Sequence, residues 1–180
     1  MMQGKVNSSS IEEAELLLEN MLDRGIKPDR VSFKTLFSAF HKAGNLDKTM
    51  HWFGFMCDTG VRYSETDVEW IIEEMTKNGR LADADAVFSQ ALNAKVLSPF
   101  IEEGEVEVID AYCFRSAVAL AAVRNRIGSK VAARFLQLEM KNRDGGSLSA
   151  VESYLRGMGA EFVKIHSKSV VKLKFPYPNG

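Results

Sequence analysis

The chain has 180 residues, of which 46% are apolar and 26% are charged, and its net charge is −1. These values are typical of a folded domain, and they exclude a disordered tail, a collagen-like chain and a small disulfide-rich scaffold. The longest apolar run, Ala117–Val123, is far shorter than the roughly 20 residues that a membrane span needs, so we expect no membrane partner.

Charge is divided unevenly along the chain. Residues 1–104 carry 11 Lys and Arg against 17 Asp and Glu, whereas residues 105–180 carry 12 against 7. This asymmetry indicates two parts with different partners, and a polyanion would be attracted to the second part.

The cysteines and histidines do not form a pattern that would bind a metal. Cys57 and Cys113 lie far apart in apolar surroundings, so we expect both to be buried free thiols. The three histidines are scattered, and we therefore expect no metal site. The first ten residues lack the pattern of a secretory signal or a transit peptide.

Residues 1–99 repeat with a period of 35. Apolar residues and glycines of one copy overlay those of the next. The matching sets are Ile11, Leu46 and Leu81; Leu18, Phe53 and Phe88; Gly25, Gly60 and Lys95; and Gly44 and Gly79. We divide this part into a partial copy, 1–29, and two full copies, 30–64 and 65–99.

Each full copy has the pattern of two helices. Phe33, Leu36, Phe37 and Phe40 follow the spacing of a one-sided helix, and the turn at 43–45 contains a glycine that can end it. In the second helix we expect Leu46, Met50, Phe53 and Cys57 to face inward. One such hairpin cannot bury its apolar face alone, so neighbouring copies must share a core.

At these residues the sequence resembles a known family. The stretch Val31–Ser64, VSFKTLFSAFHKAGNLDKTMHWFGFMCDTGVRYS, and the GIKPD ending at Gly25–Asp29 look like pentatricopeptide repeats. The resemblance covers about residues 1–99 and implies an α-solenoid of helix hairpins that binds single-stranded RNA, one base per repeat.

The resemblance also implies which residues face the RNA. Two positions read the base: one near the start of the first helix and the other at the end of the repeat. These positions hold Lys34 with Ser64 and Glu69 with Pro99, while Asp29 closes the partial copy and Val31 and Thr66 flank the base. Glu69 would repel phosphate, and Pro99 offers no side-chain hydrogen bond.

After residue 99 the pattern becomes that of a small α/β part. The acidic residues 100–105 indicate a linker, and residues 106–176 show the order β-α-β-α-β-β. We expect strands at Val106–Ile109, Ala133–Leu138, Glu161–Ile165 and Ser169–Phe175, and helices at Ser116–Ile127 and Ser147–Arg156. The alternation in the last strand is typical of a half-exposed edge strand.

Residues 106–176 resemble a degenerate small MutS-related (Smr) domain. The resemblance depends on IDAYCFRSAVALAAV, SLSAVESYLRGMGAEF and SVVKLKF. Some members of that family cut nucleic acid, which implies Asp110 as the candidate catalytic residue, with Mg²⁺ or Mn²⁺ if the chain is active and no cofactor otherwise. Tyr112 stands at the family's histidine position and cannot replace a base near neutral pH.

Basic residues of the second part are candidates for phosphate contacts. Those in loops or on the final strand are Lys141, Arg143, Lys168, Lys172 and Lys174. Those on or beside the first helix of this part are Arg115, Arg124 and Arg126.

Three functions remain open from the sequence. The first is an RNA-binding protein of the pentatricopeptide–Smr type, which the resemblance places in RNA processing, stability or translation in a plastid or mitochondrion. The second is a metal-dependent endonuclease that uses Asp110. The third is a protein-interaction module in which the acidic repeats bind a protein and the Smr-like part is inactive.

Overall fold

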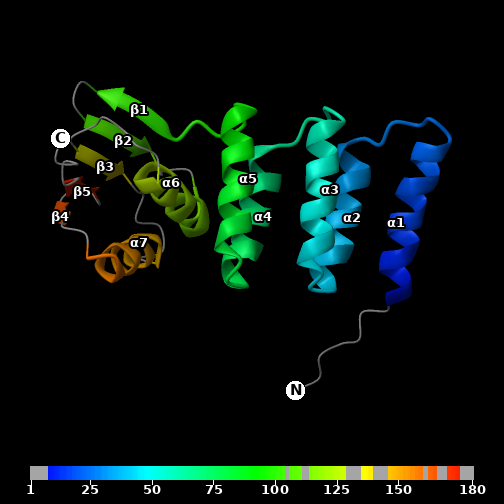
Figure 1. Cartoon of the computed structure of the whole chain (residues 1–180), viewed down its shortest axis with the longest axis horizontal. Coiled ribbons are helices and arrows are strands. Elements are labelled where there is room, and N and C mark those ends of the chain that lie inside the picture. The colour runs from blue at the N-terminus through cyan, green and yellow to red at the C-terminus, as the bar shows by residue number, and fades with distance from the viewer. Residues whose placement is uncertain are drawn as a thin grey trace, which may run out of the picture. The chain divides into compact units, whose positions relative to one another are not determined.

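The structure, a computed structural model, describes residues 8–103, 106–110, 114–128, 135–139, 146–159, 162–165 and 170–174. Five consecutive helices come first: α1 (Ser8–Asp23), α2 (Arg30–Lys42), α3 (Leu46–Asp58), α4 (Glu65–Lys77) and α5 (Leu81–Asn93). They are followed by β1 (Phe100–Glu103), β2 (Val106–Asp110), α6 (Ser116–Gly128), β3 (Phe135–Glu139), α7 (Gly146–Gly157), β4 (Phe162–Ile165) and β5 (Val170–Lys174) (Figure 1). The expected fold class, helical hairpins followed by a small α/β part, is confirmed.

The chain forms two compact units, Met1–Asp67 and Val68–Gly180. The division falls inside α4, so most of the second full copy groups with the sheet. The limits 1–99 follow the repeat period and the limits 106–176 follow the β-α-β-α-β-β pattern, and both remain predictions.

In the first unit, α2 packs against both α1 and α3. The four apolar residues that we predicted for the inner face of α2, Phe33, Leu36, Phe37 and Phe40, are all buried. In α3 the buried residues are Leu46, Thr49, Trp52, Phe53 and Met56, whereas Met50 and Cys57 are only half-buried. The inward face of α3 is therefore rotated toward Trp52 and Met56 relative to our prediction.

The turns of the repeat are built by short polar contacts. Gly44 follows α2 with a φ of +66°, a left-handed conformation that glycine adopts without strain. Asn45 then caps α3, because its side-chain oxygen accepts a hydrogen bond from the Lys48 backbone N–H at 3.2 Å. These contacts satisfy backbone groups that the two helix ends leave free.

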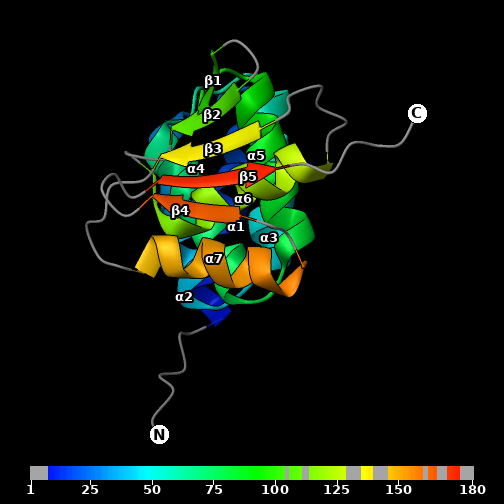
Figure 2. The same ribbon diagram turned by 90° about the vertical axis from the view of Figure 1, so that its left-hand side faces the viewer.

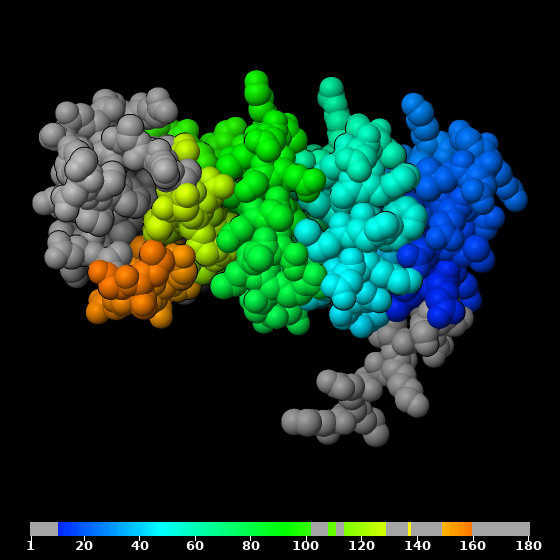
Figure 3. All heavy atoms as spheres, viewed as in Figure 1, coloured from blue at the N-terminus to red at the C-terminus, as the bar shows by residue number. Residues whose placement is uncertain are grey.

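In the second unit, α6 is a central element. It packs against α5, α7 and β2, and its side chains are buried on several sides, including Val118, Ala121, Ala122 and Val123. A helix that is apolar nearly all round must be surrounded by protein, which explains the alanine-rich sequence. Side chains of α5 and α6 meet on the face shown in the space-filling view (Figure 3).

The described residues form a sheet of five strands in the order β1-β2-β3-β5-β4 (Figure 2). β2 and β3 are parallel and are joined through α6, whereas β1 pairs with β2, and β5 with both β3 and β4, in antiparallel fashion. The order β2-α6-β3-α7-β4-β5 agrees with the β-α-β-α-β-β pattern of the sequence.

Three expectations are corrected. Phe100–Glu103, which we expected in a linker, form β1 at one edge of the sheet. β5, which we expected at an edge, lies between β3 and β4. Cys57 forms no disulfide within the described part of the chain but is half-buried rather than buried, and Cys113 lies outside the described residues.

Candidate nucleic-acid interface

The candidate interface lies at the N-terminal ends of α2 and α4. The repeat period places Asp29 and Ser64 at equivalent positions just before these helices, and Val31 and Thr66 at equivalent positions inside their first turns. All four belong to the first compact unit.

Asp29 is the cap of α2. Its Oδ1 accepts hydrogen bonds of 2.9 Å from the backbone N–H and from the hydroxyl of Ser32. These bonds, above all the one from the Ser32 backbone, lower the pKa of Asp29 below its ordinary value. Asp29 is thus an ionised, structurally engaged residue rather than a free side chain.

Val31 and Lys34 are open to solvent on α2. Val31 is 68% exposed, which is unusual for a β-branched apolar side chain, and Lys34 is also exposed. The two are three residues apart and therefore neighbours on the helix surface. A ligand can reach both without any rearrangement of the core.

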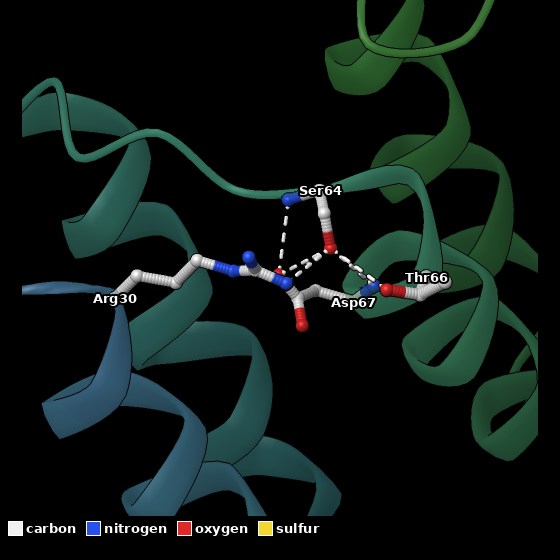
Figure 4. Close-up of polar contacts among 4 residues, drawn as sticks. All are labelled: Arg30, Ser64, Thr66 and Asp67. Carbon is white, nitrogen blue, oxygen red and sulfur yellow. Dashed lines mark hydrogen bonds and ion pairs between the residues drawn. The ribbon is translucent and has the colours of Figure 1, made fainter.

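Ser64 is at the centre of a cluster that joins α2 to the start of α4 (Figure 4). Arg30 donates from Nη2 to Ser64 Oγ at 2.6 Å and from Nε to Asp67 Oδ2 at 2.8 Å. Asp67 Oδ2 also accepts from the Ser64 backbone N–H at 2.9 Å and lies 2.8 Å from Ser64 Oγ. Thr66 Oγ1 lies 2.8 Å from Ser64 Oγ.

The charges of this cluster stabilise each other. Burial would raise the pKa of Asp67, but the hydrogen bonds from Arg30 and Ser64 and the charge of Arg30 lower it overall. The hydrogen bond to Asp67 in turn raises the pKa of Arg30. Asp67 is therefore ionised at neutral pH and acts only as a hydrogen-bond acceptor.

The second predicted base-reading pair has different surroundings. Glu69 is only 9% exposed, and its Oε1 accepts a hydrogen bond from the Arg115 backbone N–H at 3.4 Å. Pro99 is buried, and its carbonyl oxygen accepts from the Asp110 backbone N–H at 2.8 Å. Both residues contribute to packing inside the second unit, so neither presents a free side chain to a ligand.

Asp110, the candidate catalytic residue, is the last residue of β2 and is half-buried. It lies opposite Glu139 in the register of β2 and β3. Tyr112 lies outside the described residues. In the part of the chain that the structure describes, no group of three or more His, Cys, Asp and Glu side chains is placed to hold a metal ion.

The predicted phosphate contacts of the loops cannot be placed, because Lys141, Arg143 and Lys168 lie outside the described residues. Lys172 lies on β5, where it pairs with Gln137 of β3 and Val163 of β4. It is therefore on an inner strand of the sheet.

The arginines on or beside α6 have partners among the described residues of the second unit. Arg115 forms an ion pair with Glu73 of α4. Arg124 is 2.7–3.0 Å from the carboxylate oxygens of Asp85 on α5. The Arg126 guanidinium stacks over the Phe100 ring, 3.8 Å from its centroid. All three arginines thus have partners on α4, α5 or β1, and their role in phosphate contacts stays a prediction.

Sequence reasoning missed Arg30 and Asp67. The spacing Ser64-x-x-Asp67 is a helix-capping signal and would have identified Asp67. No local pattern identifies Arg30, because its partners lie 34 and 37 residues away in the sequence.

Comparison with known proteins supports the repeat. Residues 31–61, which span α2 and α3, match the family described as PPR repeat. A putative pentatricopeptide repeat-containing protein of Arabidopsis thaliana is 26% identical over 159 residues, which are 78% of this chain and 22% of that protein. Two further pentatricopeptide repeat-containing proteins of Arabidopsis thaliana are 40% identical over 63 residues (35% of this chain, 11% of that protein) and 29% identical over 150 residues (82% and 17%).

The fold and the interface define a helical-repeat protein in which hairpins precede an α/β part. The chain is similar to pentatricopeptide repeat proteins and contains one matched repeat, at residues 31–61. The chain spans at most 22% of the length of these relatives. None of the helices among the described residues combines the length and the apolar character needed to cross a membrane.

Proposed function

We propose that this chain binds single-stranded RNA through the N-terminal ends of α2 and α4. The observation that supports this most strongly is the 68% exposure of Val31, with exposed Lys34 three residues further along α2. An exposed apolar side chain offers a surface for a base, and a lysine offers a charge for a phosphate or a hydrogen-bond donor for a base carbonyl. The similarity to pentatricopeptide repeat proteins points to the same ligand, since such repeats read RNA bases one at a time.

The electrostatic part of this binding should be small. The first 104 residues have six more acidic than basic side chains, and two of the acidic groups, Asp29 and Asp67, lie at the interface itself. Affinity therefore depends more on contacts to bases than on counterion release, and its salt dependence should be shallow.

The test is a fluorescence-anisotropy titration of the chain with short single-stranded RNAs at two salt concentrations. Val31→Ser and Lys34→Ala should each weaken binding severalfold, because each removes one exposed contact. Lys42→Ala is the matched control, since Lys42 is an exposed lysine at the other end of the same helix. Failure to bind any single strand at low salt, or an equal loss in the control, would contradict the proposal.

We extend the proposal to the cellular role and to the α/β part. The three similar proteins come from a plant, which supports a role in RNA processing, stability or translation in a plastid or mitochondrion. The order β2-α6-β3-α7-β4-β5 supports an Smr-like character for the second part. Imaging of the tagged full-length gene product and sequencing of the RNA that it retains would test the first of these statements.

The alternatives remain separable by experiment. Metal-dependent cleavage of nucleic acid that is lost in Asp110→Ala would favour an endonuclease. Retention of a protein without RNA would favour an interaction module.

A further inference from the structure

We propose that Arg30 is a specificity-determining residue of this interface and that it selects guanine. The inference depends on the proposed RNA binding and deepens it, because it names the base and the group that reads it. It also assigns Ser64, the residue expected to read a base, to a structural role.

The hydrogen-bonding capacity of the Ser64 hydroxyl is fully used. A serine hydroxyl has one proton to donate and two lone pairs to accept with. Its proton must go to Asp67 Oδ2, 2.8 Å away, since an ionised carboxylate cannot donate. Its lone pairs are taken by Arg30 Nη2 at 2.6 Å and by the Asp67 backbone N–H at 3.3 Å, with Thr66 Oγ1 a third neighbour. Nothing remains with which Ser64 can contact a base.

Arg30, in contrast, has unused donors in a fixed orientation. Of its five N–H groups, one on Nε and one on Nη2 bind Asp67 and Ser64. These two N–H groups lie on one side of the planar guanidinium, and their hydrogen bonds together fix the orientation of its plane. The described residues form no further hydrogen bond or ion pair with the opposite fork, which consists of Nη1 and the second proton of Nη2, and the side chain is 49% exposed.

The charges favour a neutral partner for this fork. Arg30 and Lys34 are balanced by Asp29 and Asp67 within the same small surface. A phosphate placed at the fork would be repelled by both carboxylates, whereas a neutral base would not. A fixed guanidinium fork matches two adjacent acceptors, and the guanine O6 and N7 atoms are the pair that arginine most often contacts. The exposed Val31 side chain follows Arg30 directly and provides an apolar surface for the ring.

The experiment compares base preference in the wild-type chain and in Arg30→Lys. Each protein is titrated with single strands of uridine that carry one central guanine, 7-deazaguanine, cytosine or adenine. The wild type should bind the guanine strand about tenfold more tightly than the 7-deazaguanine strand, which lacks the N7 acceptor. Lysine keeps the charge but not the fork, so Arg30→Lys should lose this tenfold difference. Arg62→Lys, at an exposed arginine outside the cluster, should keep it.

The outcomes separate this inference from the proposed function. Binding of all strands with equal affinity by the wild type, or a preference for cytosine or adenine, would overturn the role of Arg30 and leave RNA binding intact. An equal loss on every strand in Arg30→Lys would show a phosphate contact or a structural role, and would overturn the inference. Absence of binding to every strand would overturn the proposed function, and the inference with it.

Discussion

Asp67 illustrates how one carboxylate supports both a helix end and a contact between helices. It caps the start of α4 through Ser64 and neutralises Arg30 from α2. Because its pKa is lowered in the folded state, its contribution to stability is complete above the pKa of the unfolded chain, about 3.9, and is lost as the pH falls through the lower folded value.

We therefore expect Asp67→Asn to reduce the free energy of unfolding at neutral pH by about 1 kcal/mol, the usual effect of losing a cap. The difference from the wild type should shrink as the pH falls below about 4. Denaturant unfolding at several pH values measures this. Asp58→Asn, at an exposed aspartate in α3, is the control. A difference that stays constant down to the lowest pH would contradict the assignment.

Tyr63 is a second residue with a distinctive environment. Burial, followed by its interaction with Cys57, raises the pKa of the Tyr63 phenol to about 12, and its ring packs edge-on to Phe53 with centroids 5.3 Å apart. The stability that this provides is complete below the unfolded pKa, about 10, and is lost as the pH rises toward 12. In an absorbance titration, the step missing from Tyr63→Phe should lie near pH 12. A missing step near pH 10 would indicate an unburied phenol.

The family resemblance named positions of the candidate interface, but not their contacts. It named Asp29, Val31, Lys34, Ser64 and Thr66, and the repeat period relates Asp29 to Ser64 and Val31 to Thr66. It did not identify that Ser64 is saturated or that Glu69 is buried, because both facts depend on residues brought together only by folding. A repeat register gives positions, whereas hydrogen-bond partners come from tertiary structure.

At the scale of the element, the position that follows each second helix of the repeat holds a lysine in one copy where the other copies hold glycine. Gly25 and Gly60 end α1 and α3 with φ of +69° and +70°, and Lys95 occupies the equivalent place after α5 with a φ of +56°. A left-handed conformation costs a residue with a side chain roughly 1–2 kcal/mol.

Lys95→Gly should therefore increase the free energy of unfolding by about 1 kcal/mol, after allowance for the greater entropy of glycine in the unfolded chain. Gly60→Ala should decrease it by a similar amount, because the same conformation is then imposed on an alanine. Thermal and denaturant unfolding of both variants would check this. Destabilisation by Lys95→Gly would show that the lysine side chain makes a compensating contact.

Helices and strands were predicted correctly where the apolar spacing extends over many residues. The predictions were wrong where the structure depends on which strands pair with each other. The helices α2, α4 and α6 followed from spacing, and so did the order of helices and strands along residues 106–176. Residues 100–105 looked like a linker because they are acidic, but Phe100–Glu103 pair with β2. The alternation of apolar and charged residues in β5 indicated an edge strand. Such alternation shows which face of a strand is buried, but not how many strands pair with it. β5 in fact pairs with strands on both sides.

At the scale of the whole molecule, the second unit is held together by the partners of α6. Arg124 is largely buried and contacts Asp85 of α5, and Asn125 donates to Ser89 Oγ at 3.3 Å. We expect Arg124→Met to lower the free energy of unfolding by about 2 kcal/mol, since it leaves a carboxylate without its partner. Arg156→Met, at an arginine whose side chain is 72% exposed, should have little effect. Equal stability of the two variants would contradict this role for Arg124.

The helix hairpins are consequently not interchangeable parts. Shifted by one period, Lys34, Ser38 and Met50 take the places of Glu69, Glu73 and Asp85, the acidic residues that receive Arg115 and Arg124. If the two full copies were exchanged, Lys34 would lie beside the N-terminal end of α6. The uncharged side chain of Met50 would lie beside the buried guanidinium of Arg124. The copy at 65–99 thus carries acidic residues that match the arginines beside α6, and the copy at 30–64 does not carry them.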